Sequence, residues 1–362
     1  MDSQTAAVPT TNGSRAAPHL TRQRRALGRT AVKSTISLSV RRRGLRPAFT
    51  AVRFVATAVA LAAAMALSAC GGSSDPLASG SGKCDGDVNK LTVGSANFPE
   101  SETVADVYAE ALRANGFTVD TKLNIGSREA YIPALRECSI GVIPDYTGNL
   151  LQYLDKSTTA TDADAVNQAL TKALGSDLVA GTPASGEDSD AVVVTQETVQ
   201  KWNLHSIADL AAHSSEVSFG GSPEFAERPD GLPGLKKHYN LDIPSNKYVP
   251  ISDEGGPATV RALTTGQVTA ADIFTTSPAI KENNLVVLAD PQHNFAAQNV
   301  VPVLNAKKKS DKALKVLDTI SAKLTTDQLI ALNEQVSGAA KTEPAAAAKS
   351  WVAAQGLDKP IG

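Results

Sequence analysis

The chain lacks the motifs by which many enzymes built on α/β folds are identified. It contains no G-x-S-x-G nucleophile motif, and its five histidines show no spacing typical of metal ligands. The segment GSGKC at residues 80–84 lacks the first glycine of a phosphate-binding P-loop. Acidic pairs such as Asp188 and Asp190 have no histidine near them in sequence. Because no nucleophile with a neighbouring base is indicated, we expect no catalysis, no metal and no cofactor.

Long apolar runs are also scarce. Residues 54–67 carry no charge, but about fourteen residues are short for a helix that spans a bilayer. Residues 1–53 before this run hold eleven Lys or Arg and one acid, and the sequence LSACG follows it at residues 67–71. This order is typical of an export signal covering residues 1–69, the alternative being a buried helix that ends at a cysteine. The leader is atypically long, which a translation start near Val52 would explain.

The LSAC sequence at the end of this leader resembles the bacterial lipobox. That resemblance implies a lipid on Cys70 and anchorage at the extracytoplasmic face of the bacterial cell membrane. Residues 70–87 then have the composition of a flexible tether, with the sequence GGSSDPLASGSG at 71–82.

Positive charge is in short supply once residues 1–69 are removed. Of the 35 Lys and Arg, 24 stay, against 36 of the 37 Asp and Glu, so the net charge becomes −12. Such a surface argues against nucleic acid as a partner and is compatible with a cationic ligand. About 290 residues suffice for two domains of ordinary size.

Cysteine is rare too. Besides Cys70 the chain has only Cys84, just before the first expected strand, and Cys138, in a turn before Ile140. In an exported protein such a pair is a candidate disulfide, and the alternative is two free buried thiols.

What the sequence does contain is a regular alternation of strand-like and helix-like segments. Strands are expected at 91–95, 117–123, 140–143, 190–195, 217–220, 247–252, 268–274, 285–288 and 299–304. Helices are expected at 102–115, 127–136, 149–154, 162–174, 206–210, 234–239 and 258–263, and over most of 310–355. The alternation predicts parallel sheets. Since the pattern restarts near residue 190, we predict two α/β lobes, residues 88–190 with 300–362 and residues 191–299, joined by two crossing strands.

A weak internal repeat suggests where a ligand would bind. ALRECSIGVIPDYTG (134–148) and ALTTGQVTAADIFTT (262–276) align without a gap, so that Tyr146-Thr147 matches Phe274-Thr275. Each pair follows a strand, and open α/β sheets bind ligands at the carboxyl ends of their strands. Aromatic faces attract organic cations, so the two rings are predicted to hold a ligand between the lobes. The alternative is that ordinary βα units look alike at this level.

Four stretches resemble one known family: LTVGSANFPESETVADVYAEAL, NIGSREAYIPALRECSIGVIPDYTGNLLQYL, PEFAERPDGLPGLKKHYNL and LVVLADPQHNFAAQNVVPVLN. It comprises the substrate-binding lipoproteins of ABC importers for osmoprotectants such as glycine betaine, choline and related quaternary amines. The resemblance runs from about residue 88 to the C-terminus. It implies a two-lobed type II periplasmic-binding-protein fold and a monomeric receptor that is not an enzyme. Such a receptor delivers a small solute to a permease and, through it, to ATPase subunits.

The resemblance also implies roles for individual residues. In that family an aromatic cage holds the trimethylammonium group, and Tyr146 and Phe274 match two of its positions. The chain departs from the pattern at Asp190, where an aromatic residue is usual, and at Gln298 or Asn299, where a tyrosine is usual. Asp190 would either pair with an ammonium or mark a subgroup that binds a more polar solute.

Arg228, in the RPDG sequence, is the candidate for binding a ligand carboxylate, with a structural salt bridge as the alternative. Further lining candidates are Phe98, Ser127, Tyr131, Thr147 and Thr275, although Tyr131 could equally pack in the core of its lobe. Two other classes of function are left open, an exported enzyme and an envelope adaptor that has lost its ligand.

Overall fold

The computed structural model describes residue 84 and residues 86–361. The predicted leader, the cysteine predicted to carry a lipid and most of the tether lie outside the described residues. Among the residues that are described, no helix has both the length and the apolar character needed to cross a bilayer.

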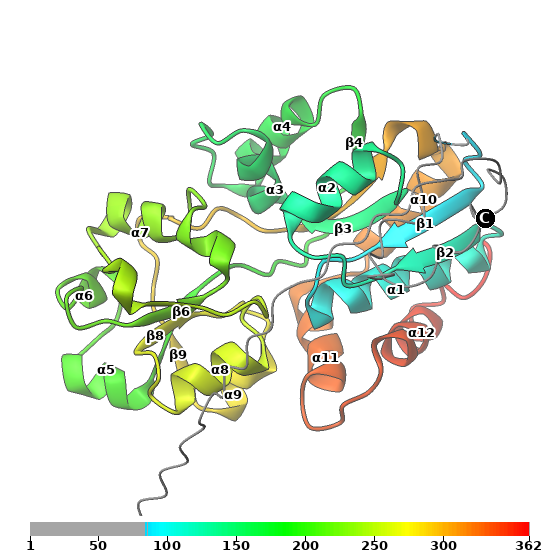
Figure 1. The fold of residues 1–362 in the computed structure, drawn as a ribbon. Coiled ribbons are helices and arrows are strands. Elements are labelled where there is room, and N and C mark those ends of the chain that lie inside the picture. The colour runs from blue at the N-terminus through cyan, green and yellow to red at the C-terminus, as the bar shows by residue number, and fades with distance from the viewer. Residues whose placement is uncertain (1–83, 85, 362) are drawn as a thin grey trace, which may run out of the picture. The chain divides into compact units, whose positions relative to one another are not determined.

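Two five-stranded sheets form the described part of the chain, one in each of two lobes (Figure 1). The sheet of lobe 1 has the order β2-β1-β3-β10-β4. Its strands are β1 (Lys90–Gly94), β2 (Thr118–Lys122), β3 (Val142–Tyr146), β4 (Leu178–Ala180) and β10 (Val300–Asn305). The helices of lobe 1 are α1 (Pro99–Ala114), α2 (Arg128–Arg136), α3 (Thr147–Leu154), α4 (Ala163–Ala173), α10 (Asp311–Ser321), α11 (Thr326–Val336) and α12 (Pro344–Ala354), with the short 3₁₀ helix η3 (Ala306–Lys308).

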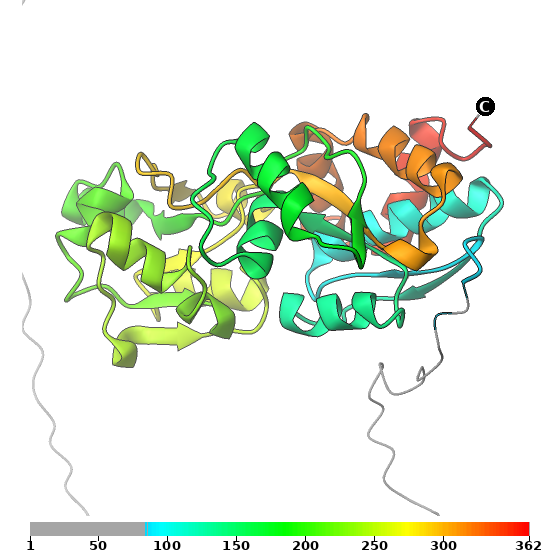
Figure 2. The same ribbon diagram turned by 90° about the horizontal axis from the view of Figure 1, so that it is seen from above.

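The sheet of lobe 2 has the order β7-β6-β8-β5-β9. Its strands are β5 (Val192–Thr195), β6 (Phe219–Gly221), β7 (Tyr248–Pro250), β8 (Ala270–Asp272) and β9 (Leu285–Val287). Around them lie α5 (Gln196–Trp202), α6 (Ile207–Ala211), α7 (Leu232–Tyr239), α8 (Pro257–Thr264) and α9 (Pro278–Glu282), with the 3₁₀ helices η1 (Pro223–Ala226) and η2 (Ser245–Lys247). Seen from above, the lobes lie end to end with the chain passing between them (Figure 2).

The prediction of purely parallel sheets is wrong for one strand in each lobe. β10 pairs antiparallel with β3 and β4, and β5 pairs antiparallel with β8 and β9. The reason is the double crossing of the chain. A strand that has just entered a lobe must run away from the other lobe, whereas β3 and β8 run toward it. The carboxyl ends of β3 and β8 therefore meet the junction between the lobes.

Helix α1 shows how local pattern and packing agree in lobe 1. Its apolar positions Val104, Val107, Tyr108 and Leu112 are all fully buried in the core of that lobe. Gly116 follows the helix with φ +81°, the left-handed conformation that glycine adopts without a steric penalty, as its place after the helix predicts. The helix begins at Pro99, three residues earlier than expected, because proline is well tolerated in the first turn.

A disulfide joins Cys84 to Cys138, with the two Cα atoms 5.3 Å apart. The pairing expected from an exported protein is thus confirmed. The bond ties the segment before β1 to the turn between α2 and β3, which closes a loop with a sequence separation of 54 residues. Closing a loop of this length restricts the unfolded chain more than the folded one and so favours folding.

Candidate ligand site between the lobes

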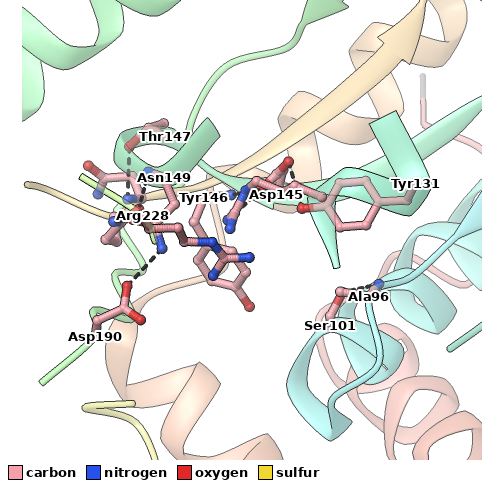
Figure 3. A network of polar contacts seen from close by, with 12 residues as sticks. Ala96, Ser101, Tyr131, Asp145, Tyr146, Thr147, Asn149, Asp190 and Arg228 are labelled. Carbon is pink, nitrogen blue, oxygen red and sulfur yellow. Dashed lines mark hydrogen bonds and ion pairs between the residues drawn. The ribbon is translucent and has the colours of Figure 1, made fainter. Parts of the chain in front are cut away.

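A small cavity lies where the two lobes meet, at the carboxyl ends of β3 and β8. It measures about 30 Å³ and is lined from both lobes and from the crossing segment. The lining residues are Ala96, Asn97, Phe98, Ser101, Ser127, Arg128, Tyr131, Pro144, Tyr146, Asn149, Asp188, Asp190, Arg228, Glu254 and Phe274. Figure 3 shows much of the polar network around it. Because so small a space admits little more than water, a solute must enter through movement of the lobes or side chains.

Three aromatic rings form one wall of this cavity. The internal repeat places Tyr146 and Phe274 in the lining, as predicted. Phe98 contacts both, with ring centroids 6.0 Å from Tyr146 and 5.2 Å from Phe274. The sandwich expected from the repeat is therefore a row of three rings, with Phe98 in the middle. Such a row presents apolar and π-electron surface suited to a methylated cation.

Asp145, in β3, holds two lining residues of the cavity in place. This carboxylate is 0% exposed and lies 2.8 Å from the Nη2 atom of Arg128. The hydroxyl of Tyr131 donates to its other oxygen at 2.9 Å. Tyr131 was considered either as a lining residue or as part of the core of its lobe. It is both, because it is buried in lobe 1 and also lines the cavity. Burial of a charge is tolerated where an opposite charge and hydrogen bonds compensate it, as here.

Asp190 is held by a short chain of amides (Figure 3). Asn149 Nδ2 donates to Asp190 Oδ2 at 2.7 Å, and the backbone N–H of Asn149 donates to Gln298 Oε1 at 3.0 Å. Gln298 Nε2 also donates to Asn149 Oδ1. Gln298 and Asn299, which were predicted to contact the ligand, do not line the cavity. Gln298 instead orients Asn149, which does.

The threonines of the repeat have a different position from the one predicted. Thr147 and Thr275 lie outside the cavity lining, and each binds the crossing segment beside it. The Thr147 N–H donates to Asn299 O at 3.0 Å, and Thr147 Oγ1 accepts from Asn299 N at 3.1 Å. Thr275 makes the same two bonds with Ser189, both at 3.0 Å. In both copies of the repeat the aromatic residue lines the cavity and the threonine bonds the crossing segment.

Contacts between the lobes frame the entrance beside α2. Arg228 lines the cavity and also pairs with Glu129 of lobe 1, Nη2 to Oε2, at 3.5 Å. Ser127 stands at the N-cap of α2, yet its hydroxyl makes no capping bond and donates to Glu224 of lobe 2 at 3.2 Å. Arg228 thus lines the cavity while its guanidinium is paired with a carboxylate of lobe 1.

An acidic group that the sequence did not reveal faces the cavity from lobe 2. Glu254 has a left-handed backbone, φ +48°, in the loop before α8, and it has no side-chain hydrogen bond within the described residues. Burial raises the pKa of Glu254 to about 6, although Arg228 opposes the shift. Burial, with the nearby Asp190 carboxylate, raises the pKa of Asp230 to about 7. A left-handed backbone at a non-glycine residue such as Glu254 is strained, and strain of this kind is typical of functional loops. The sequence gives no sign of this conformation.

Two further carboxyl groups with raised pKa values are buried, Asp188 in the cavity lining and Asp272 in β8. Burial and the carboxylate of Glu100 raise the pKa of Asp188 well above its usual value. Burial and Asp190 do the same for Asp272, whose Oδ1 has no hydrogen-bond partner among the described residues. A cation entering the cavity would find several carboxyl groups within reach, while no cluster suited to a metal occurs in the described part of the chain.

These raised pKa values predict how stability depends on pH. Where the folded protein holds a proton more tightly than the unfolded chain, stability is greatest at low pH and is lost as pH rises through the folded pKa. For Glu254 and Asp230 the unfolded pKa values are 4.5 and 3.8 and the folded ones about 6 and 7, so the loss falls between about pH 4 and 7. We expect calorimetry of the ligand-free protein at fixed ionic strength to show a melting temperature that falls across this range. The Glu254→Gln, Asp230→Asn double variant should flatten it, and a wild-type melting temperature that rises from pH 5 to 7 would contradict the assignment.

Comparison with known proteins agrees with this geometry. The family model of OpuAC, the substrate-binding domain of ABC-type glycine betaine transport systems, matches residues 89–354. The chain belongs to this family. The glycine betaine-binding protein YehZ of Escherichia coli is 25% identical over 214 residues, which are 57% of this chain and 70% of that protein. A glycine-betaine-binding protein of Pseudomonas aeruginosa is 26% identical over 226 residues, 59% of this chain and 71% of that protein.

A solved structure supports the fold as well. The crystal structure of a glycine betaine/carnitine/choline ABC transporter protein aligns with a TM-score of 0.59 and 21% identity, covering 74% of this chain and 100% of that chain. The predicted two-lobed, type II periplasmic-binding-protein fold is therefore confirmed. The protein is an extracytoplasmic substrate-binding protein of an ABC transporter.

Proposed function

We propose that the cleft binds a small quaternary ammonium solute, such as glycine betaine or choline, and that the protein delivers it to its permease. The row of Phe98, Tyr146 and Phe274 carries this proposal, because it faces the same cavity as Asp190 and Glu254. Aromatic faces bind a methylated cation without hydrogen bonds, and the attraction grows when water is excluded. The carboxylates add charge attraction in a desolvated site.

Arg228 supports the binding of a zwitterion as well as a simple cation. Its guanidinium lines the cavity on the lobe 2 side, and Arg128 on the opposite side is already paired with Asp145. A ligand carboxylate would therefore go to Arg228, exchanging with Glu129. Guanidinium and carboxylate form the paired hydrogen bonds that such recognition uses.

Closure of two lobes accompanies binding in this proposal. Residues 88–190 with 300–362 would move as one body and residues 191–299 as the other, about the crossing segments held by Thr147 and Thr275. The protein would act as a monomer, without chemistry on the solute. It would be anchored to the outer face of the bacterial cell membrane through a lipid on Cys70, as the LSAC sequence suggests.

A matched pair of ligands tests the proposal. Choline and 3,3-dimethyl-1-butanol have nearly the same shape, but only choline is charged. We expect calorimetry with purified protein to show that glycine betaine or choline binds at least about 100-fold more tightly than the neutral alcohol. The reason is that both the cation–π attraction and the attraction to the carboxylates require a positive charge on the ligand. Equal binding of the two, or no binding of glycine betaine, choline, carnitine or proline, would refute the cation site.

The departures from the usual cage favour one alternative. Asn149 and the carboxylates of Asp190 and Glu254 could serve a cationic solute that carries N–H or O–H donors. Ethanolamine, which has a primary ammonium in place of the methylated one, separates the two. Tighter binding of ethanolamine than of choline would assign recognition to the carboxylates rather than to the rings.

A further inference from the structure

A buried carboxylate beside the ligand cavity is bonded to three different parts of the fold. Glu100, in the first turn of α1, is 5% exposed. Its Oε1 accepts from the hydroxyl of Tyr146 at 2.6 Å, and its Oε2 accepts from Thr276 Oγ1 at 2.7 Å and from Asn333 Nδ2 at 2.5 Å. One carboxylate therefore connects the end of β3, the segment after β8 and helix α11.

These donors belong to different lobes. Tyr146 and Asn333 are in lobe 1, whereas Thr276 is in lobe 2 and is 2% exposed. Asn333 Nδ2 also lies 2.9 Å from Thr276 Oγ1. The Thr276 hydroxyl is thus enclosed by lobe 1 groups as the structure stands. Separation of the lobes would remove it from Glu100 while leaving Asn333 and Tyr146 in place.

Apart from Tyr146, the members of this network lie beside the ligand cavity and not in its lining. Glu100, Thr276 and Asn333 line a neighbouring groove of about 430 Å³. The groove and the cavity share Phe98, Asp188, Glu254 and Phe274. A substitution at Thr276 can therefore alter the contact between the lobes without removing a group that faces the ligand.

We propose that Glu100 and Thr276 form a latch that holds the lobes closed, built on the same carboxylate that bonds the hydroxyl of Tyr146. Hydrogen bonds to a charged acceptor are stronger than neutral ones, and a buried carboxylate that loses a donor pays the cost of its desolvation. Lobe closure supplies that donor through Thr276. The same carboxylate accepts from the hydroxyl of Tyr146 within lobe 1, so the latch is bonded directly to one ring of the row.

The latch has a kinetic consequence that rests on the proposed function of the cleft. A ligand leaves only when the lobes open, so weakening the latch should speed dissociation and leave association nearly unchanged. We expect Thr276→Val, which replaces the hydroxyl with a methyl group of similar size, to raise the dissociation rate of choline or glycine betaine about tenfold in stopped-flow measurements. A change in melting temperature with an unaltered dissociation rate would indicate a purely structural role and overturn the latch.

Lobe closure can also be measured without any ligand. Lys281 on α9 and Lys349 on α12 are exposed and lie in different lobes, so spin labels at Lys281→Cys and Lys349→Cys report the separation by electron–electron double resonance. We expect Thr276→Val to shift the distance distribution of the ligand-free protein toward longer separations. Thr265→Val is the matched control, because Thr265 lines the same groove but bonds only to Arg261 O, at 2.8 Å.

The two readouts separate failure of the latch from failure of the proposed ligand. If neither choline nor glycine betaine binds the wild-type protein, the distance distributions still decide on the latch. Distributions that are the same for wild type, Thr276→Val and Thr265→Val would overturn it. Glu100→Gln serves as a second variant with the same expected direction, and should it fail to fold, Thr276→Val carries the test.

Discussion

Replacing Tyr146 with alanine is expected to weaken binding of choline or glycine betaine by at least about 100-fold, equivalent to roughly 2.7 kcal/mol. The substitution removes one ring of the three-ring wall and with it a desolvated cation–π contact, worth about 2 kcal/mol. It also takes the hydroxyl donor away from Glu100, which is buried. Titration calorimetry of the variant against the wild-type protein measures the loss directly.

A series at this position separates the ring from the hydroxyl. Tyr146→Phe keeps the aromatic face and should retain most of the affinity. Because it removes the hydrogen bond to Glu100, the ligand should dissociate faster than from the wild-type protein. Tyr108→Phe is the matched control, because the Tyr108 hydroxyl is buried without a hydrogen-bond partner among the described residues. Binding by Tyr146→Ala within threefold of wild type would remove Tyr146 from the ligand site.

The second large effect concerns stability. Replacing Arg128 with methionine should lower the free energy of unfolding by about 3–5 kcal/mol, because Asp145 would stay buried without its cation. The hydrogen bond from Tyr131 would persist but cannot supply a charge. Urea denaturation followed by circular dichroism gives the change, and adding Asp145→Asn to the variant should recover part of it.

Arg113 provides the control for this experiment. It forms an ion pair with Glu110 at 2.6 Å on the surface of α1, where its side chain is 40% exposed. Exposed pairs of this kind contribute about 0–1 kcal/mol, so Arg113→Met should cost little. Equal losses for Arg128→Met and Arg113→Met would mean that the buried pair of Arg128 and Asp145 stabilises the fold no more than an exposed pair.

The internal repeat was the part of the sequence that best predicted the site, because it indicated both a strand and the residues at the end of that strand. A strand that ends in an aromatic residue and a threonine occurs at Tyr146 and again at Phe274, and both rings line the cavity. The repeat correctly predicted that both rings line the cavity, because β3 and β8 each pair with the strand by which the chain enters their lobe. Local sequence was therefore enough to predict which aromatic residues lie at the junction between the lobes.

Partners distant in sequence account for what the repeat could not show. Thr147 was expected to face the ligand, but its hydroxyl bonds a segment about 150 residues further along the chain. The contact from Glu100 to Asn333 joins residues 233 positions apart. Glu254 lines the cavity from an ordinary-looking loop, and only its place in the fold brings it there. Long-range pairing of this kind leaves no periodic signal in the sequence.

The mixed direction of the sheets has the same origin. Alternation of strands and helices indicates parallel pairing, and most strands of both lobes follow it in running toward the junction. β5 and β10 differ because each begins where the chain enters its lobe. The entry points depend on how the two lobes are connected, which hydrophobic pattern alone does not specify.

In the proposed complex a methylated cation lies against Phe98, Tyr146 and Phe274 between the lobes. Isotope-filtered nuclear Overhauser spectroscopy with unlabelled choline or glycine betaine and isotope-labelled protein tests it most directly. We expect cross-peaks from the N-methyl protons to the ring protons of these three residues, and we expect the cross-peaks to residue 146 to be absent in Tyr146→Ala. Bound ligand whose methyl protons contact none of the three rings would contradict it.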